Sequence, residues 1–199
     1  MYDRGEIMSE EERLTILEWL ESLKKNNKLR SLSNRRWDYT LHIDNNTIPI
    51  AVWKIKKRLI EREGLHTYRQ DPAFEDILTL LPNGSILHPH TDPNSFDGSI
   101  HCRFNVFVNV PNIFDTYYGE YRVEAKNRHY VMCRSGIDMH WSSENKTDDR
   151  VALSFGYILP MKKINELYII PKNAIVSSLK VSNLYISLIN YGHSFTSGV

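Results

Sequence analysis

This sequence is short of several features that would mark a specialised class of protein. Its 2 cysteines in 199 residues are too few for a disulfide framework. The 25 basic and 24 acidic residues leave a formal net charge of +1, so charge gives no support to a nucleic-acid partner. No apolar run is as long as a transmembrane helix, and we find no internal repeat, low-complexity segment or long linker.

What remains is the composition of an ordinary globular protein, with 41% hydrophobic and 25% charged residues. The length suits one domain. We expect residues 1–199 to form that domain, with an N-terminal support (1–72), a core (73–160) and a C-terminal extension (161–199). The acidic segment that starts at Met8 is unlike a signal peptide, so we expect no membrane association and a cytoplasmic location.

The N-terminal support has the periodicity of helices. Ser9 and Glu12 have the spacing of a capping box, and apolar residues follow at helical intervals at Leu14, Leu17, Leu20 and Leu23. A second helix is predicted over residues 51–63, where Gly64 provides the stop signal. Between the two helices, the alternating residues 36–44 predict a strand or hairpin.

The core reads as a series of short strands. Residues 78–92 form a strand, a Pro-Asn-Gly turn and a second strand, and further strand-like stretches follow at 103–110, 119–123, 129–134, 139–143 and 150–157. Turn-punctuated strands of this kind favour an all-β barrel or sandwich over alternating strands and helices. The residues after Pro160 allow either two more strands or a short helix and a strand.

A possible metal site lies at the end of the second of these strands, at His90-Thr91-Asp92. Side chains alternate along a strand, so His90 and Asp92 point to the same face and can reach one metal. His140, in a later strand, can supply a second imidazole. Two imidazoles and one carboxylate are the ligand set of non-haem Fe(II) oxygenases, which leaves coordination positions open.

With Arg150 ten residues after His140, this order of residues resembles the Fe(II)/2-oxoglutarate-dependent dioxygenase superfamily, over roughly residues 73–160. The resemblance implies a mainly β fold, a double-stranded β-helix (jelly roll) core with N-terminal supporting helices. It implies that His90, Asp92 and His140 bind Fe(II), and that Arg150 binds the distal carboxylate of 2-oxoglutarate. Guanidinium suits this role because its planar fork can grip a carboxylate with two hydrogen bonds.

Two branches of the superfamily are suggested, the aspartyl/asparaginyl β-hydroxylases and the prolyl hydroxylases. Arg103 and Asn105 are similar to the R-x-H pair of the first branch, which contacts the cosubstrate, with Asn105 in place of His. The implied reaction is hydroxylation of a C–H bond with O2 and 2-oxoglutarate, releasing succinate and CO2. The substrate would be an amino acid, a peptide or protein, or another small molecule.

Several alternatives stay open at this point. Asp138 alternates with His140 and is a rival carboxylate ligand. His88 has the same strand parity as His90 and Asp92, so it could point to the same face as an additional site residue. His101 and His129 lie at strand edges, where we expect them to face solvent. Trp141 and Tyr157 are expected in the core or the pocket wall, and Tyr117, Tyr118 and Tyr121 either pack together or line an entrance.

The function also has two alternatives. A cupin-like metalloprotein would use the same barrel without 2-oxoglutarate, and it would not need a cation such as Arg150. A catalytically silent jelly-roll protein that only binds would have no use for three intact ligands. The loop from Pro93 to Ile100, rich in small and polar residues, is predicted to be a mobile flap beside the metal.

Overall fold

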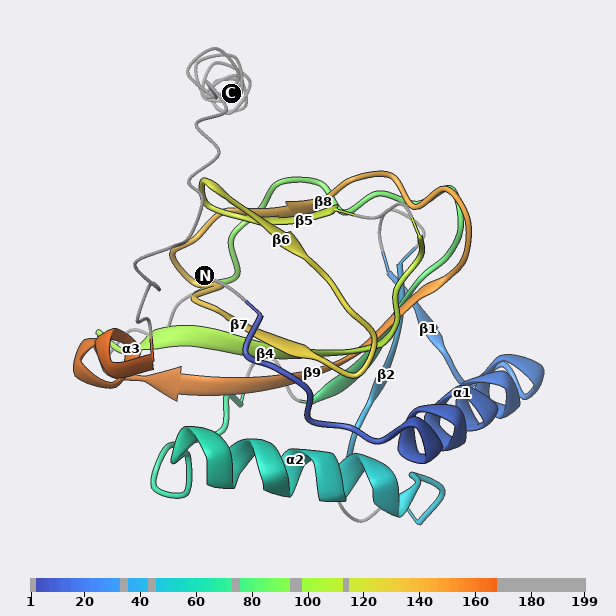
Figure 1. The fold of residues 1–199 in the computed structure, drawn as a ribbon, viewed down its shortest axis with the longest axis horizontal. Coiled ribbons are helices and arrows are strands. Elements are labelled where there is room, and N and C mark those ends of the chain that lie inside the picture. The colour runs from blue at the N-terminus through green and yellow to red at the C-terminus, as the bar shows by residue number, and fades with distance from the viewer. Residues whose placement is uncertain are drawn as a thin grey trace, which may run out of the picture.

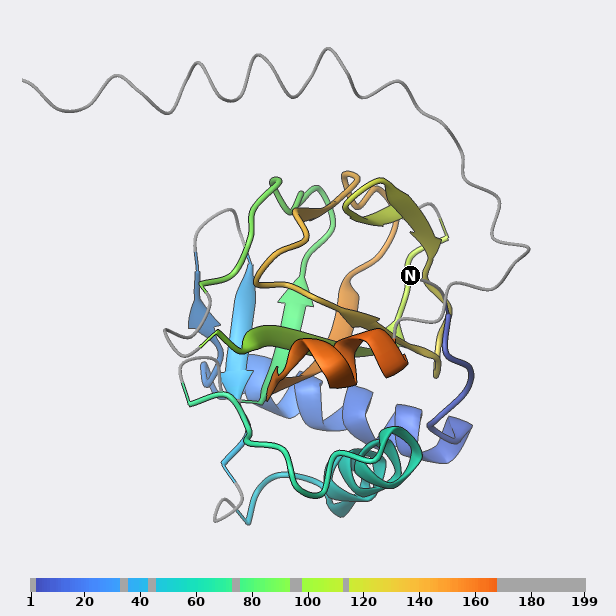
Figure 2. The ribbon, with the colours of Figure 1, turned by 90° about the vertical axis from the view of Figure 1, so that its left-hand side faces the viewer.

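The structure is a computed structural model that describes residues 3–32, 36–42, 46–72, 76–93, 98–112 and 115–167. Two antiparallel β-sheets face one another, and helices lie on the outer face of the larger sheet (Figure 1). Figure 2 shows helices α1 (Glu10–Lys25) and α2 (Ile50–Glu63) on one side of this major sheet and the minor sheet on the other. The predicted mainly β, jelly-roll architecture with N-terminal supporting helices is confirmed.

The major sheet is built around two long, buried strands. Within the described ranges its strand order is β1-β2-β3-β9-β4-β7. In that order the bounds are Arg30–Ser31, Trp37–Thr40, Ile77–Leu81, Arg150–Leu159, Ile100–Asn109 and Tyr130–Cys133. Most residues of β4 and all but one residue of β9 are buried, because the helices cover one face of the pair and the minor sheet covers the other.

The minor sheet has the order β6-β5-β8, with bounds Tyr121–Glu124, Asp115–Tyr118 and His140–Ser142. The sequence predicts one strand over residues 119–123. The structure has a hairpin instead, whose turn begins at Gly119 with a φ of 60°. Because glycine has no Cβ, it adopts this left-handed conformation without strain, so Gly119 belongs to the turn and not to a strand.

The second strand predicted before Asp92 is mostly absent. Residues 82–89 form no regular strand, and His90 pairs only with His140, in an isolated antiparallel bridge. Pro89 explains part of this difference, because a proline has no N–H to donate to a ladder. The bridge nevertheless places His90 directly beside the first residue of β8.

Helix α1 begins at the predicted cap, and helix α2 covers the predicted residues 51–63 with Ile50 added at its start. The side chain of Ser9 accepts a hydrogen bond from the Glu12 backbone N–H, and the Glu12 carboxylate accepts one from the Ser9 N–H. Helix α2 ends at Gly64, which has a φ of 61°. The buried face of α1 consists of Ile16, Trp19, Leu20 and Leu23. Leu14, which the sequence places on that face, is exposed.

Two hydrophobic clusters hold the layers together. The larger one lies between the helices and the major sheet. The smaller one lies between the sheets and consists of Leu81, Phe107, Tyr118, Val123, Ala125, Val131, Cys133 and Ala152. Three of these side chains, Leu81, Tyr118 and Cys133, also line a pocket between the sheets. The pocket is therefore a polar continuation of the smaller core.

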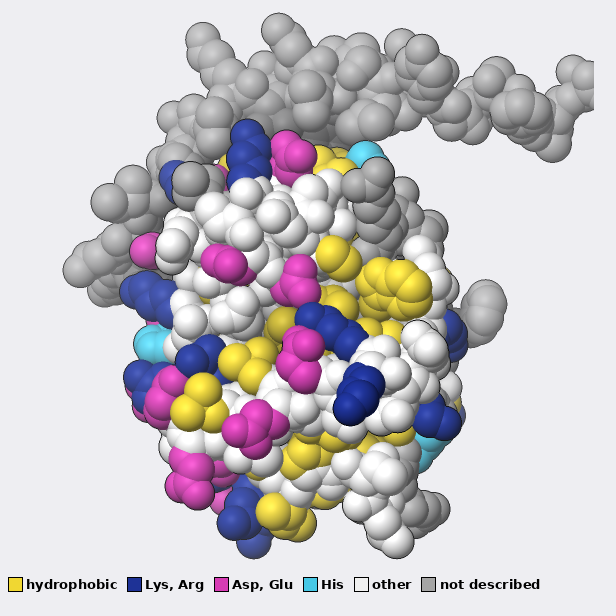
Figure 3. Space-filling model, turned by 90° about the vertical axis from the view of Figure 1, so that its right-hand side faces the viewer, with side chains coloured by type: hydrophobic (Ala, Val, Ile, Leu, Met, Phe, Trp, Pro, Cys, Tyr) yellow, Lys and Arg dark blue, Asp and Glu magenta, His cyan; other side chains and the backbone are white. Residues whose placement is uncertain are grey.

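The chain continues after β9 into a short helix, α3 (Met161–Leu167), which buries Ile164 and Leu167. The rest of the expected C-terminal extension, residues 168–199, lies outside the described residues, as do residues 94–97 of the loop predicted to be a flap. Within the ranges given above, no helix has the length and apolar character needed to cross a bilayer. Figure 3 shows one face of the molecule, on which basic and acidic side chains are intermingled.

Candidate active site

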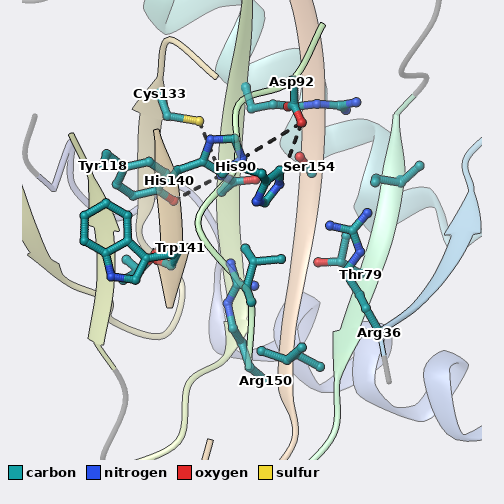
Figure 4. A pocket seen from close by; sticks show the side chains of 16 residues that line it. Arg36, Thr79, His90, Asp92, Tyr118, Cys133, His140, Trp141, Arg150 and Ser154 are labelled. Atoms are coloured by element: carbon teal, nitrogen blue, oxygen red, sulfur yellow. Dashed lines mark hydrogen bonds and ion pairs between the residues drawn. The ribbon is translucent and has the colours of Figure 1, made fainter. Parts of the chain in front are cut away.

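The three predicted metal ligands lie together in the pocket between the sheets. His90, Asp92 and His140 each offer a ligand atom, and these atoms lie within 4.8 Å of one another. Asp92 Oδ1 is 3.9 Å from His90 Nε2 and 4.0 Å from His140 Nε2. Figure 4 shows the two imidazoles and the carboxylate converging from the loop before β4 and from β8.

Backbone hydrogen bonds set this arrangement. The N–H of His90 donates to the carbonyl of His140 over 3.2 Å, and the N–H of His140 donates back over 2.8 Å. The N–H of Asp92 donates to the carbonyl of Ser135 over 2.7 Å. His90 and Asp92 are therefore held in extended backbone, with the alternation that their spacing predicts.

Each imidazole is oriented through its other ring nitrogen. Nδ1 of His90 lies 2.8 Å from the carbonyl of His88, and Nδ1 of His140 lies 3.1 Å from the carbonyl of Asp138. Donation from Nδ1–H to a carbonyl leaves the lone pair on Nε2, the nitrogen that faces the centre. His88 and Asp138 thus take part through their backbone carbonyls.

The side chains of these two residues do not face the candidate metal ligands. That of His88 is exposed. The Asp138 carboxylate forms hydrogen bonds of 2.6 and 2.8 Å with the guanidinium of Arg134. Of the two rival carboxylates, it is Asp92 that lies between the imidazoles.

The surroundings favour the protonation states that a metal requires. Burial alone would raise the pKa of Asp92, but a hydrogen bond from His101 and the charges of His140, His101 and Arg103 lower it to about 2. Burial, with the nearby His90, lowers the pKa of His140 to about 4, although Asp92 opposes the shift. At neutral pH the site therefore offers an ionised carboxylate and a neutral imidazole.

This donor set fits a divalent first-row transition metal. Imidazole nitrogen and carboxylate oxygen are the ligands of such ions, and two His with one carboxylate on one side of the ion leave the other side open. Here the open side is the pocket, which the same three residues line.

Arg150, the first residue of β9, lies in the wall of the same pocket (Figure 4). Its guanidinium is buried, with Cζ 5.4 Å from the centre of the Phe107 ring. Burial lowers the pKa of Arg150 from its ordinary value of 12.5, and Tyr118 opposes that shift. Because arginine stays charged far above neutral pH, the pocket contains a buried cation.

The other two predicted cosubstrate contacts, Arg103 and Asn105, lie on β4 and line the pocket as well. Arg103 Nε lies 3.2 Å from His101 Nε2. The Asn105 amide donates to the hydroxyl of Tyr118 over 3.2 Å, which fixes it in the pocket wall.

Some residues of the site escape sequence reasoning. The prediction that His101 faces solvent is wrong, because its side chain is completely buried. His101 has the same strand parity as Arg103 and Asn105, and that parity could have placed it on the pocket face. His129, also expected in solvent, is half-buried and forms an ion pair with Asp3 over 2.7 Å.

Two further lining residues come from distant parts of the chain. Arg36 precedes β2 and lines the pocket on the side of Thr79, while Trp141 of β8 lies across from it (Figure 4). The Trp141 ring stacks on Tyr117, with ring centres 5.0 Å apart and an interplanar angle of 5°. Nothing in the sequence near Arg36 indicates the pocket, because its place depends on long-range packing.

Comparison with known proteins adds information about the fold. No protein-family model matches the sequence, and no curated protein matches it as a relative. Solved structures do match. A prolyl hydroxylase from Trichoplax adhaerens, in complex with a hypoxia inducible factor peptide fragment, is 12% identical with a TM-score of 0.61, covering 84% of this chain and 86% of that one.

Two other solved structures are similar to the same extent. A Pseudomonas putida prolyl-4-hydroxylase is 13% identical with a TM-score of 0.60, covering 79% of this chain and 91% of that one. HygX from Streptomyces hygroscopicus, with nickel and 2-oxoglutarate bound, is 14% identical with a TM-score of 0.59, covering 79% of this chain and 82% of that one. The chain therefore shares the fold of these prolyl hydroxylases and of HygX.

Proposed function

We propose that this chain is an Fe(II)- and 2-oxoglutarate-dependent dioxygenase that hydroxylates a C–H bond of an amino-acid, peptide or other small substrate. The observation that carries the proposal is the convergence of His90, Asp92, His140 and the buried Arg150 on one pocket. The fold supports it, because HygX, a protein of the same fold, binds a metal and 2-oxoglutarate in its solved structure.

The residues take separate roles in this proposal. His90, Asp92 and His140 would hold Fe(II), and the carbonyls of His88 and Asp138 keep both imidazoles aimed at it. When bound, iron and 2-oxoglutarate supply the oxidising chemistry: one oxygen atom of O2 enters succinate, formed with CO2, and the other becomes the new hydroxyl. The protein contributes positioning and a pocket that limits access of water.

Arg150 is the proposed anchor of the cosubstrate. A buried guanidinium in the pocket wall can bind a carboxylate with two charge-assisted hydrogen bonds, and burial strengthens them. Arg103 and Asn105 face the same space from β4 and are proposed as further contacts of the cosubstrate or of an acidic substrate.

The proposed substrate is a peptide or a small molecule. The Trichoplax adhaerens prolyl hydroxylase of the same fold is solved with a peptide fragment. In this chain the aromatic face of Trp141 and the cation of Arg36 lie on opposite sides of the pocket, where they can contact a substrate. A reducing compartment such as the cytoplasm would keep the iron ferrous, and both cysteines are free thiols.

The first test measures succinate released from 2-oxoglutarate with Fe(II) and ascorbate. We expect turnover from the wild type, none from His90→Ala, and for Arg150→Ala a KM for 2-oxoglutarate raised by roughly tenfold or more, because a charge-assisted contact is lost. His66→Ala and Arg69→Ala are matched controls, since both side chains are exposed and outside the pocket lining.

Two results would contradict the proposal. If the wild type neither binds Fe(II) nor releases succinate, the dioxygenase assignment fails. If it binds Fe(II) but not 2-oxoglutarate, and Arg150→Ala changes nothing, a cupin-like metalloprotein is the better description.

A further inference from the structure

His101 lies directly behind the carboxylate of the candidate metal site. It is on β4, its side chain is fully buried, and its Nε2 lies 3.2 Å from Asp92 Oδ2. On the opposite side of the ring, Nδ1 forms a close ion pair with the carboxylate of Asp71, which is also buried. One imidazole thus connects an interior carboxylate to a candidate metal ligand.

The two oxygens of Asp92 have different neighbours. Oδ1 faces His90 and His140, at 3.9 and 4.0 Å from their Nε2 atoms. Oδ2 faces His101. Arg103 Nε also lies 3.2 Å from His101 Nε2, so this nitrogen faces both a guanidinium and Oδ2. When His101 Nε2 carries a proton, it donates to Oδ2 and holds the carboxylate in the rotation that presents Oδ1 to the centre of the site.

Asp71 is itself fixed to the rigid centre of the fold. Its N–H donates to the carbonyl of Gly156 on β9 over 3.1 Å, and the adjacent Gln70 forms a bridge with Tyr157. His101 pairs with Ile158 in the β4–β9 ladder. The orientation of Asp92 is therefore set by two neighbouring strands of the major sheet, and not only by the loop on which Asp92 lies.

We propose that His101, held by Asp71, is a positioning residue that keeps Asp92 rotated with Oδ1 toward the candidate metal centre. The inference rests on the proposed function, because it takes the site to bind a divalent metal. A carboxylate that binds through both oxygens would occupy an additional coordination position. Presenting Oδ1 alone would leave that position open.

The test is the affinity of the purified full chain for Co(II), measured by calorimetric titration, beside the thermal unfolding of each metal-free variant. His101→Leu removes the hydrogen bond to Asp92, and we expect its Kd for Co(II) to rise roughly 10–100-fold, the usual cost of losing such a partner. His101→Gln keeps a donor at about the position of Nε2, so its Kd should stay within about threefold of the wild type.

His129→Leu is the matched control. It removes another histidine that is ion-paired with an aspartate, Asp3, but this histidine is half-buried and its aspartate is not a candidate metal ligand. If His101 acts only in folding, the Leu variant should have a lower unfolding temperature. The Gln and Leu variants should then have the same Kd for Co(II). If His101→Leu does not fold, His101→Asn replaces it, since its amide is too short to reach Asp92.

The outcomes are distinct. A folded His101→Leu or His101→Asn variant that binds Co(II) as tightly as the wild type overturns the positioning role while leaving the proposed function intact. If the wild type does not bind Co(II), or if His90→Ala binds it equally well, both the positioning role and the proposed function are overturned. Weak binding in the Leu or Asn variant, with recovery in the Gln variant, supports the inference.

Discussion

At the scale of single residues, the polar side chains of the pocket are held by contacts behind them. The imidazoles of His90 and His140 lie against backbone carbonyls, and Asp92 lies against His101. Such contacts restrict rotation of the ligands before any ion arrives, so less conformational entropy is lost on binding.

Burial has a second consequence at this scale, in alkaline solution. It raises the pKa of Tyr157, with help from the negative charge of Asp76, and it raises those of Tyr118 and Tyr130 to about 12. An unfolded tyrosine releases its proton near pH 10. As the pH rises above 10, the unfolded state loses protons that the folded state keeps, so stability is lost.

We therefore predict that Tyr157→Phe makes stability less dependent on alkaline pH. Between about pH 10 and pH 11.5 the free energy of unfolding should fall less steeply than in the wild type, by up to about 1.4 kcal/mol per pH unit for the one group removed. The edge-to-face contact with Phe104, at 5.9 Å, is retained. Urea titrations at pH 9 and pH 11 measure this, and parallel decreases in both proteins would contradict it.

The sequence predicts those site residues whose spacing is local. Strand alternation puts His90 and Asp92 on one face, and the structure has them so. The position of His101 near a turn predicts an exposed side chain, and this prediction is wrong because the side chain is buried against Asp71 and Asp92. Arg36 gave no signal, because its approach to the pocket depends on how β2 pairs with β3.

At the scale of helices and strands, α1 illustrates how local signals fix an element. Its first turn contains Glu10, Glu11 and Glu12 and its last contains Lys24 and Lys25, so both ends complement the helix dipole. The capping box at Ser9 satisfies backbone donors that would otherwise lack partners within the helix.

We predict that Ser9→Ala lowers the free energy of unfolding by about 1 kcal/mol, because it removes the acceptor of the Glu12 N–H. Chemical denaturation monitored by circular dichroism provides the measurement. Glu18→Ala is the control, since Glu18 is exposed in the middle of the same helix and has no role in the cap. Equal losses in the two variants would show that the cap does not stabilise α1 in this context.

Helices and strands are predictable where the apolar periodicity or a turn signal is strong. They are less predictable where pairing between distant strands determines the structure. Helices α1 and α2 follow from their caps and apolar spacing. Residues 85–89, which follow the predicted turn, were expected to begin a strand but form no ladder. Residues 115–124 become a hairpin because Gly119 turns the chain and β8 provides a neighbour for β5. Neither outcome is encoded in the local sequence alone.

At the scale of the whole molecule, the two sheets contribute different parts of one pocket. β8 of the minor sheet provides His140, while β9 and β4 of the major sheet provide Arg150 and Arg103. Ligands that bind there should stabilise the folded chain as a whole, because the unfolded chain has no such site.

We predict that Mn(II) raises the unfolding temperature and that 2-oxoglutarate raises it further only when the metal is present. At 100 times its Kd each ligand adds about 2.7 kcal/mol, which for a chain of this size is about 5–10 °C. Differential scanning fluorimetry measures both increments, and excess EDTA should reverse them. Arg150→Ala should keep the metal increment and lose about half or more of the second, because a tenfold rise in Kd at the same concentration leaves about 1.4 kcal/mol.

The same experiment has a clear negative outcome. If 2-oxoglutarate shifts the unfolding temperature of metal-free protein as much as that of the metal-loaded protein, the acid is not bound through the metal.

The small hydrophobic cluster between the sheets gives the pocket one more property. Leu81, Tyr118 and Cys133 belong to that cluster and to the pocket wall at once. The distance between the candidate metal ligands on one layer and Arg150 on the other therefore depends on how tightly this cluster is filled. It acts as a spacer. Under the proposed function, the length of dicarboxylic acid that the site accepts would depend in part on cluster residues behind the pocket wall, such as Phe107 and Ala152, which do not line the pocket.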